Sequence, residues 1–273
     1  MNSLCITTLV DKRYWEYVEL FTWCCKRAYP EYDVKILKKE ELFPGYPDRG
    51  YTTNALRFLT GAAPYEGYSF IYITDIDIMI LREKPTLLNF HQMDMRGCFS
   101  NSIRGSSNKF SFKNETWTGH ESLSGLHFCS REWFDHIEPQ AKKYRELLKT
   151  AEVGRGFDGH MLYKMCKELG WPIPGKKKLI KRHHGIHLGT FRLWGEGKPL
   201  INRPERAGVP MSKDSADSAI RKRVKPWKIN RWLKIMADPE YAAIKKRIHN
   251  TEILGILKKL EDFCLCQCQA PAS

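Results

Sequence analysis

The chain lacks several features that would place it in other classes of protein. Its 273 residues contain no apolar run of about twenty residues, so no segment is expected to cross a membrane as a helix. The nine cysteines include no Cys-x-x-Cys pair, which argues against a structural zinc site, and their scattered positions suit reduced cytosolic thiols. The opening MNSLCITTLVDKRYW has no basic n-region of a signal peptide. We therefore expect a cytoplasmic protein.

The chain has few acidic residues compared with basic ones. It contains 31 Asp and Glu and 45 Lys and Arg, which gives a net charge of +14. Such an excess predicts an anionic partner: a nucleotide, a nucleic acid or a membrane surface. The positive charge gathers at 176–182 (KKKLIKR), 221–228 (RKRVKPWK) and 245–247 (KKR). No recognised nucleic-acid motif accompanies it, so we expect no nucleic-acid partner. A nucleic-acid-binding protein stays an alternative, and it predicts salt-sensitive binding.

The order of the predicted elements indicates an α/β fold. Residues 3–10 and 32–37 have strand composition, and 14–30 between them has apolar residues at helical spacing, closed by Pro30. This strand–helix–strand unit is typical of a parallel sheet. The alternation continues with a helix at 52–62, strands at 68–83, 97–102 and 124–130, a long polar loop at 105–122, and helices at 131–151 and 160–170.

Two aspartates interrupt the apolar segment 68–83, which reads YSFIYITDIDIMILRE. On a strand buried on both faces, Asp75 and Asp77 would point to the same side. Two buried carboxylates that close repel each other unless a cation lies between them. Oxygen ligands suit Mg²⁺ or Mn²⁺, and such ions commonly keep phosphate oxygens as further ligands. The alternative is that one Asp caps the next turn and the other is solvated.

These features in this order resemble the GT-A fold of nucleotide-sugar glycosyltransferases, in particular the glycogenin-like and bacterial lipooligosaccharide galactosyltransferases. In that group a helix with an Arg precedes a strand that ends in Asp-x-Asp. The resemblance implies that Arg57 contacts the nucleotide and that Asp75 and Asp77 hold Mn²⁺. It also implies a Rossmann-like, mixed but mainly parallel sheet flanked by helices over 1–202, followed by a basic helical extension over 203–273.

Two further segments extend the resemblance. SLSGLHF at 122–128 resembles the stretch that lines the donor sugar, which implies roles for Ser124 and Gly125. HLGTFRLWG at 187–195 resembles a His-x-x-Gly-x-x-Lys-Pro-Trp segment, which implies that His187 is the third metal ligand. The predicted nucleotide and donor contacts are Thr8, Arg57, Asp75, Ile76, Ser124, Gly125, Gly189 and Arg192.

The chain also departs from that group. One residue separates His187 from Gly189 where the group has two, and Arg192-Leu193 stands where it has Lys-Pro. The usual Asp-Gln-Asp is reduced to Asp158 with its neighbours. The chain therefore looks like GT-A without being a regular member of that retaining group. Within HHGIH, His183 and His184 are alternative ligands.

The acceptor side depends on the segment GFDGHMLY at 156–163. It resembles the Asp-bearing turn under the acceptor, which makes Asp158 the candidate catalytic carboxylate. The alternative is that Asp158 caps a helix over 160–169. The glycines of this turn would let the backbone approach the sugar. In the polar loop, Trp117 is a candidate sugar platform, with His120 and Glu121 as further acceptor contacts.

The remaining basic residues have two interpretations. Lys181 and Arg182 could hold phosphate oxygens, whereas the lysines at 176–178 suit a solvated face. The stretches 227–237 and 242–263 have the pattern of amphipathic helices. They suit either an anionic membrane surface or ordinary packing on the domain with solvated charges.

The leading hypothesis is a glycosyltransferase that depends on Mn²⁺ (or Mg²⁺). It would move a hexose from a nucleotide-sugar, by resemblance a UDP-sugar, to a glycan or glycolipid of the cell surface, such as lipopolysaccharide or capsule. We expect it in the cytoplasm, with peripheral contact to the inner face of the membrane. The alternatives are a nucleotidyltransferase, although 7–13 lacks its Gly-rich signature, an anionic-surface or nucleic-acid binder, and a metal-free carbohydrate binder. The sugar, the acceptor and the stereochemistry stay open.

Overall fold

The computed structural model has an α/β architecture that divides into two compact units, which we describe separately. The first unit contains residues 1–15, 29–76 and 82–182, and the second contains 16–28, 77–81 and 183–273. The residues that the structure describes are 3–48, 51–101, 103–104, 110–112, 115–117, 121–124, 126–173, 184–192, 220 and 224–269.

A five-stranded mixed sheet forms the centre of the first unit, in the order β2-β1-β3-β10-β5. β1 pairs in parallel with β2 and β3, whereas β10 runs antiparallel to β3 and β5. All seven residues of β1 are buried, as expected for a central strand of near-continuous apolar sequence. The predicted α/β class with a partly parallel sheet is therefore confirmed. The strands are β1 (Leu4–Val10), β2 (Asp33–Lys38), β3 (Phe70–Ile73), β5 (Phe99–Ser100) and β10 (His127–Ser130).

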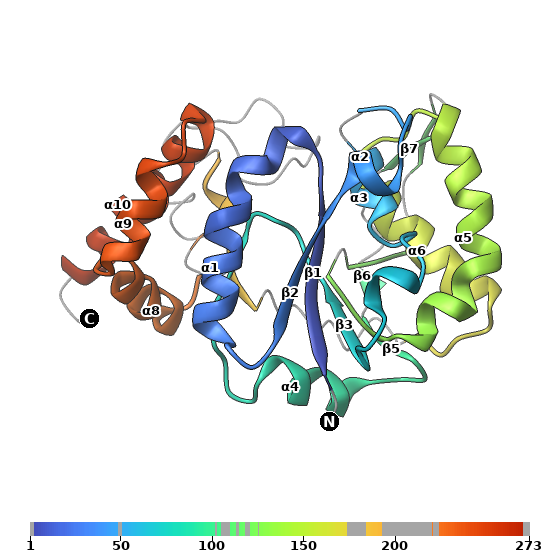
Figure 1. Ribbon diagram of the computed structural model, residues 1–273, viewed down its shortest axis with the longest axis horizontal. Coiled ribbons are helices and arrows are strands. Elements are labelled where there is room, and N and C mark those ends of the chain that lie inside the picture. The colour runs from blue at the N-terminus through green and yellow to red at the C-terminus, as the bar shows by residue number, and fades with distance from the viewer. Residues whose placement is uncertain are drawn as a thin grey trace. The chain divides into compact units, whose positions relative to one another are not determined.

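Helices cover the sheet of this unit. α3 (Thr52–Leu56), α5 (Glu132–Thr150) and α6 (Phe157–Glu168) lie on one side of β1 and β3 (Figure 1). Their buried residues form one hydrophobic core with β1, β3 and β10. α4 (Leu87–Asp94) supplies a histidine whose ring stacks on Phe128 of β10, with ring centroids 4.7 Å apart. The shorter helices are α2 (Lys39–Leu42) and the 3₁₀ helix η2 (Ala63–Tyr65).

Some predicted elements differ from the structure. The helix expected at 52–62 ends at Leu56, and the helix expected from 160 begins at Phe157. The expected polar loop 105–122 contains strands, since Phe and Trp alternate there with polar residues, a pattern typical of strands. Within this stretch β7 (Phe110–Phe112) pairs with β8 (Glu115–Trp117). β9 (Ser122–Leu123) begins at its last residue and pairs with β6 (Ile103–Arg104), which precedes it.

The segment that carries the two aspartates is not one strand. β3 ends at Ile73, and Thr74 makes the last ladder bond when its N–H donates to the carbonyl of Thr7 at 3.0 Å. β4 (Ile78–Ile80) then pairs antiparallel with β11 (Gly185–His187). The aspartates lie on the connection between β3 and β4, so strand alternation does not decide where their side chains point. That part of the prediction was wrong.

The second unit is mainly helical. Its helices are α1 (Val18–Ala28), the 3₁₀ helix η3 (Leu188–Phe191), α8 (Pro226–Met236), α9 (Pro239–Lys246) and α10 (Thr251–Gln269), while the 3₁₀ helix η1 (Lys12–Tyr17) leads into α1. α1 packs on β4 and α9, and α10 packs on α8 and η3. Trp232 of α8 is fully buried and meets Tyr241 edge-to-face at 5.6 Å. The predicted C-terminal helices are thus confirmed.

Three sequence expectations concern the chain as a whole. The predicted domain boundary at residue 203 lies outside the described residues and stays a prediction. No helix in the described part of the chain combines the length and the apolarity that crossing a membrane would require. None of the eight cysteines whose side chains are described is in a disulfide, and seven of them are buried.

Candidate metal centre

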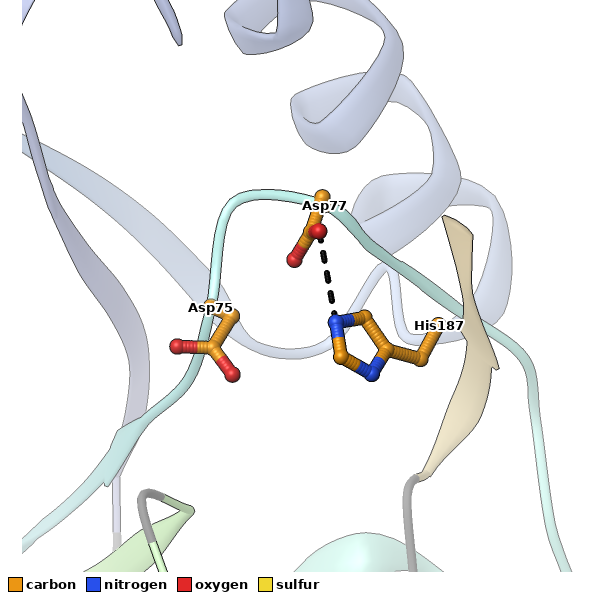
Figure 2. Close-up of side chains that lie close together, drawn as sticks. All are labelled: Asp75, Asp77 and His187. Atoms are coloured by element: carbon orange, nitrogen blue, oxygen red, sulfur yellow. Dashed lines mark ion pairs between the residues drawn. The ribbon is translucent and has the colours of Figure 1, made fainter. Parts of the chain in front are cut away.

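The pairing of β11 with β4 brings His187 to Asp77. The register places His187 opposite Ile78, and the ladder continues where the N–H of Leu188 donates to the carbonyl of Asp77 at 2.8 Å. The imidazole Nε2 then lies 3.2 Å from Oδ2 of Asp77 (Figure 2). Two residues far apart in the sequence are thus held together by backbone pairing.

Gly185 is the residue that lets β11 lie so close to β4. A Cβ built at this position would lie 1.9 Å from the carbonyl oxygen of Met79, which is far closer than atoms can approach. Any side chain here would push the strands apart. The glycine therefore sets the distance between the two strands that carry Asp77 and His187.

The environment of Asp77 keeps its carboxylate ionised. The side chain is only 11% exposed, and burial alone would raise its pKa. The nearby charge of His187, its hydrogen bond and the charge of Arg192 outweigh burial and lower the pKa of Asp77 to about 2. Arg192 Nη2 lies 4.0 Å from the same oxygen, Oδ2. At neutral pH this carboxylate is a negatively charged potential ligand.

Tyr17, just before α1, is a neighbour of this carboxylate that the sequence did not single out. It is almost fully buried, and its pKa is raised by burial and by the charge of Asp77, while Arg192 acts in the opposite direction. The phenol therefore stays protonated at physiological pH. Its position in the amphipathic pattern of 14–30 gave no sign of this polar role.

Asp75, Asp77 and His187 form a group that could hold a metal ion. Each offers one ligand atom, and these atoms lie within 4.8 Å of one another. Asp75 and Asp77 lie on the same short connection, and His187 comes from β11 (Figure 2). Two carboxylate oxygens and one imidazole nitrogen suit a divalent ion such as Mn²⁺ better than Ca²⁺. The donor set fits the predicted metal.

Gly189 lies against the same ligand atoms. A Cβ at this position would lie 2.9 Å from Nε2 of His187 and 3.1 Å from Oδ2 of Asp77. These atoms are the ends of side chains, so they could turn away from an added methyl group. The glycine therefore leaves space beside two potential ligands, and a larger residue would move those ligands.

We expect Gly189→Ala to weaken Mn²⁺ binding by about 10-fold or more, the loss that displaced ligands typically cause. The free energy of unfolding of the metal-free protein should change little, since side-chain ends absorb the methyl group. Gly255→Ala in α10 is the matched control, because a Cβ there meets nothing within 4 Å. Isothermal titration with Mn²⁺ and urea unfolding check both expectations. Equal Mn²⁺ affinity in the two variants would contradict the role given to Gly189.

In the first unit, Arg57 links two of the predicted site carboxylates. Its guanidinium hydrogen-bonds to Asp75 and lies with Nη2 3.1 Å from Oδ2 of Asp158. Arg57 is 5% exposed; burial would lower its pKa, but the two carboxylates outweigh burial and raise it. Arg57 thus orients Asp75 and Asp158 in this structure. Its predicted contact with a nucleotide stays a prediction.

Asp158 lies in the first turn of α6, whose N-cap is Gly156 with a φ of +83°. The alternative that Asp158 is the N-cap was therefore wrong. A Cβ at Gly159 would lie 2.5 Å from the carbonyl oxygen of Leu123, so this glycine is needed for packing of α6 on β9. The fold alone therefore explains why glycine occupies both positions of this turn, and no contact with a sugar is needed to explain it.

Glu121 lies immediately before β9 and contacts α6. The hydroxyl of Tyr163 donates to its carboxylate, and Nδ1 of His160 lies 3.1 Å from its backbone carbonyl oxygen. Burial and Glu121 raise the pKa of Tyr163 to about 12. The predicted acceptor contact Glu121 is thus beside the helix that carries Asp158.

Ser124 is held by a residue that the sequence analysis did not single out. The side chain of Asn101 donates to the carbonyl of Ser124 at 3.0 Å and accepts from its N–H at 3.1 Å. Asn101 also lies 3.0 Å from Nδ1 of the buried His127. The signal that the sequence offered was the polar Asn101 directly after the strand β5.

The other predicted site residues are placed as follows. Thr8 and Ile76 are buried, and Trp117 lies on β8 opposite Phe110. His184 is fully buried on the other side of Gly185, and its carbonyl accepts from the N–H of Leu81. Outside the described residues lie Gly125, His120, Lys181, Arg182 and His183.

A comparison of the chain with models of protein families, with curated proteins and with solved structures gave no match in any of the three.

Proposed function

We propose that the protein is a metal-dependent glycosyltransferase that uses a nucleotide-sugar donor. The observation that carries this proposal is the group of Asp75, Asp77 and His187, whose ligand atoms lie within 4.8 Å of one another. It follows β3 of a partly parallel sheet, and ligands of open α/β sheets commonly bind outside the carboxyl ends of the strands. The resemblance of the segments around these residues to GT-A enzymes supports the same activity.

Each residue of the site has a role in this proposal. Asp75, Asp77 and His187 would hold Mn²⁺ or Mg²⁺. When bound, the ion supplies positive charge that stabilises the departing nucleoside diphosphate. Arg192 is 37% exposed and belongs to the same cluster, so its guanidinium is suited to bind phosphate oxygens.

The acceptor side is assigned to the first turn of α6. Asp158 is the candidate catalytic carboxylate, and Arg57 fixes its orientation through a hydrogen bond of 3.1 Å. Glu121, from the segment before β9, is the second carboxylate of this region. We propose a hexose as the transferred sugar, UDP as the nucleotide, and a glycan or glycolipid of the cell surface as the acceptor.

A direct test is isothermal titration of the protein with UDP, GDP and CDP, each with and without Mn²⁺. We expect one of the three to bind in the micromolar range, which corresponds to about −8 kcal/mol, and only when Mn²⁺ is present. The expectation rests on an ion that is shared between the protein ligands and the diphosphate. UMP, which has no diphosphate, is the control and should bind weakly with or without metal. Failure of all three diphosphates to bind in a metal-dependent way would reject the proposal.

A stripe on α8 supports a second role, contact with an anionic membrane surface. Trp227, Arg231 and Lys234 are exposed on one side of the helix, which contains no acidic residue. The guanidinium of Arg231 lies 5.8 Å from the centre of the Trp227 ring. A tryptophan among basic residues is common at membrane interfaces. Peripheral attachment of a cytoplasmic enzyme stays a prediction on this basis.

A further inference from the structure

Two lysines of the C-terminal helices reach the backbone of the segment that carries His187 and Arg192. Nζ of Lys228, on α8, donates to the carbonyl of Gly185 at 2.5 Å. Nζ of Lys259, on α10, donates to the carbonyl of Arg192 at 3.0 Å. The two lysines therefore hold the two ends of the segment 185–192, and all of these residues belong to the second unit.

Lys228 is an unusual residue because it is almost completely buried. Only 7% of it is exposed, although it carries a charge that is costly to remove from water. Its ammonium also lies 5.4 Å from the centre of the Trp227 ring, where a cation is stabilised by the aromatic face. An apolar side chain would fill this space at lower cost. What such a side chain could not provide is the hydrogen bond to the strand that carries His187.

Lys259 acts at the other end of the segment. α10 packs on η3, and Phe263 meets Phe191 edge-to-face with ring centroids 5.7 Å apart. The bond from Lys259 fixes the carbonyl of the next residue, Arg192, whose guanidinium extends to within 4.0 Å of Asp77. Packing and hydrogen bonding together thus set the direction in which Arg192 leaves η3.

We propose that Lys228 and Lys259 are positioning residues of the metal centre, so that α8 and α10 form part of the functional site. The inference rests on the proposed function, because it assumes that Asp77 and His187 hold a divalent ion. Ligands must be held within about 0.5 Å of their productive positions, and residues behind the ligands provide that constraint. Removal of such a supporting hydrogen bond typically lowers metal affinity 10- to 100-fold.

The test compares Lys228→Met and Lys259→Met in the full chain with Lys225→Met and Lys258→Met, two exposed lysines that lie at the N-cap of α8 and on α10. Mn²⁺ affinity is measured by titration monitored with electron paramagnetic resonance, which counts free Mn²⁺ directly. We expect a loss of about 10-fold or more in each of the first pair and less than about twofold in each of the second. Lys259→Arg keeps a cationic donor and should restore affinity to within about threefold of the wild type.

Each outcome decides the question. If the wild type binds Mn²⁺ and the folded Lys228→Met and Lys259→Met proteins bind it equally well, the inference is overturned while the proposed function stands. If the wild type binds no Mn²⁺, both are overturned. If Lys228→Met does not fold, Lys259→Met and its Arg counterpart decide alone, because Lys259 is only partly buried.

Discussion

Replacement of Asp77 by asparagine is expected to reduce metal-dependent nucleotide binding by about 100-fold or more, since a charged ligand is lost outright. Asp77 is the carboxylate to which both His187, at 3.2 Å, and Arg192, at 4.0 Å, are directed. An amide of the same shape keeps the packing but offers a neutral oxygen, so the charge on the ion is no longer compensated. Titration with the preferred nucleoside diphosphate in the presence of Mn²⁺ measures this loss.

The control for Asp77→Asn is Asp135→Asn, an equivalent change at an exposed position of α5. It should leave nucleotide binding unchanged. Urea unfolding without metal separates loss of ligation from loss of fold, because a folded Asp77→Asn protein that fails to bind has lost only the centre. Wild-type binding in Asp77→Asn would remove Asp77 from the site and with it the metal group that carries the proposed function.

The second large effect is expected on stability, from Arg57→Met. Arg57 is the buried cation between Asp75 and Asp158, and loss of one partner of a buried ion pair typically costs about 3–5 kcal/mol. Asp75 is 30% exposed and water can solvate part of its charge, so we expect the lower end, about 3 kcal/mol. The free energy of unfolding from urea titration at pH 7 gives the value.

Two further variants isolate the cause of that loss. Arg82→Met breaks an exposed pair with Glu31 in which both side chains are at least 40% exposed, so it should cost less than about 1 kcal/mol. Addition of Asp158→Asn to Arg57→Met should recover part of the stability, because it removes one of the two carboxylates left without a cation. If Arg57→Met costs no more than Arg82→Met, Arg57 does not hold these carboxylates in solution.

The N-terminal part of the fold could be predicted because its signals are local. The strand at 3–10 and the helix that follows it are each specified by consecutive residues. β1 begins one residue later than expected, and α1 begins at Val18 because the expected first turn is the 3₁₀ helix η1. The apolar run at 68–83 predicted one strand wrongly, because its pairing is not local. Ile78–Ile80 pairs with Gly185–His187, and no pattern within 68–83 reports a partner so distant in the sequence.

The residues of the candidate site likewise divide into those with a local sequence signal and those without one. The neighbours Asp75 and Asp77 were visible as a motif, and His187 was chosen among three histidines only through a resemblance. Lys228 and Lys259 could not be found, because each acts on a backbone carbonyl that any sequence would supply. The sequence shows only positive charge at these two positions, and the sequence analysis interpreted the charges of these helices as exposed to a membrane or to solvent. Burial, which a sequence does not display, separates Lys228 from Lys234, the exposed lysine of the same helix.

The two glycines of the His187 segment predict different patterns of mutational tolerance. At Gly185 an added Cβ meets a backbone carbonyl, whereas at Gly189 the three nearest atoms belong to the side chains of Asp77 and His187. In a library of all single substitutions, a screen for folded protein should therefore remove every variant at 185 and retain most variants at 189. A screen for Mn²⁺ binding should remove the variants at both positions. A position whose variants fail the screen for folded protein is needed for the backbone of the centre. A position whose variants fold but bind no ligand only keeps space for that ligand.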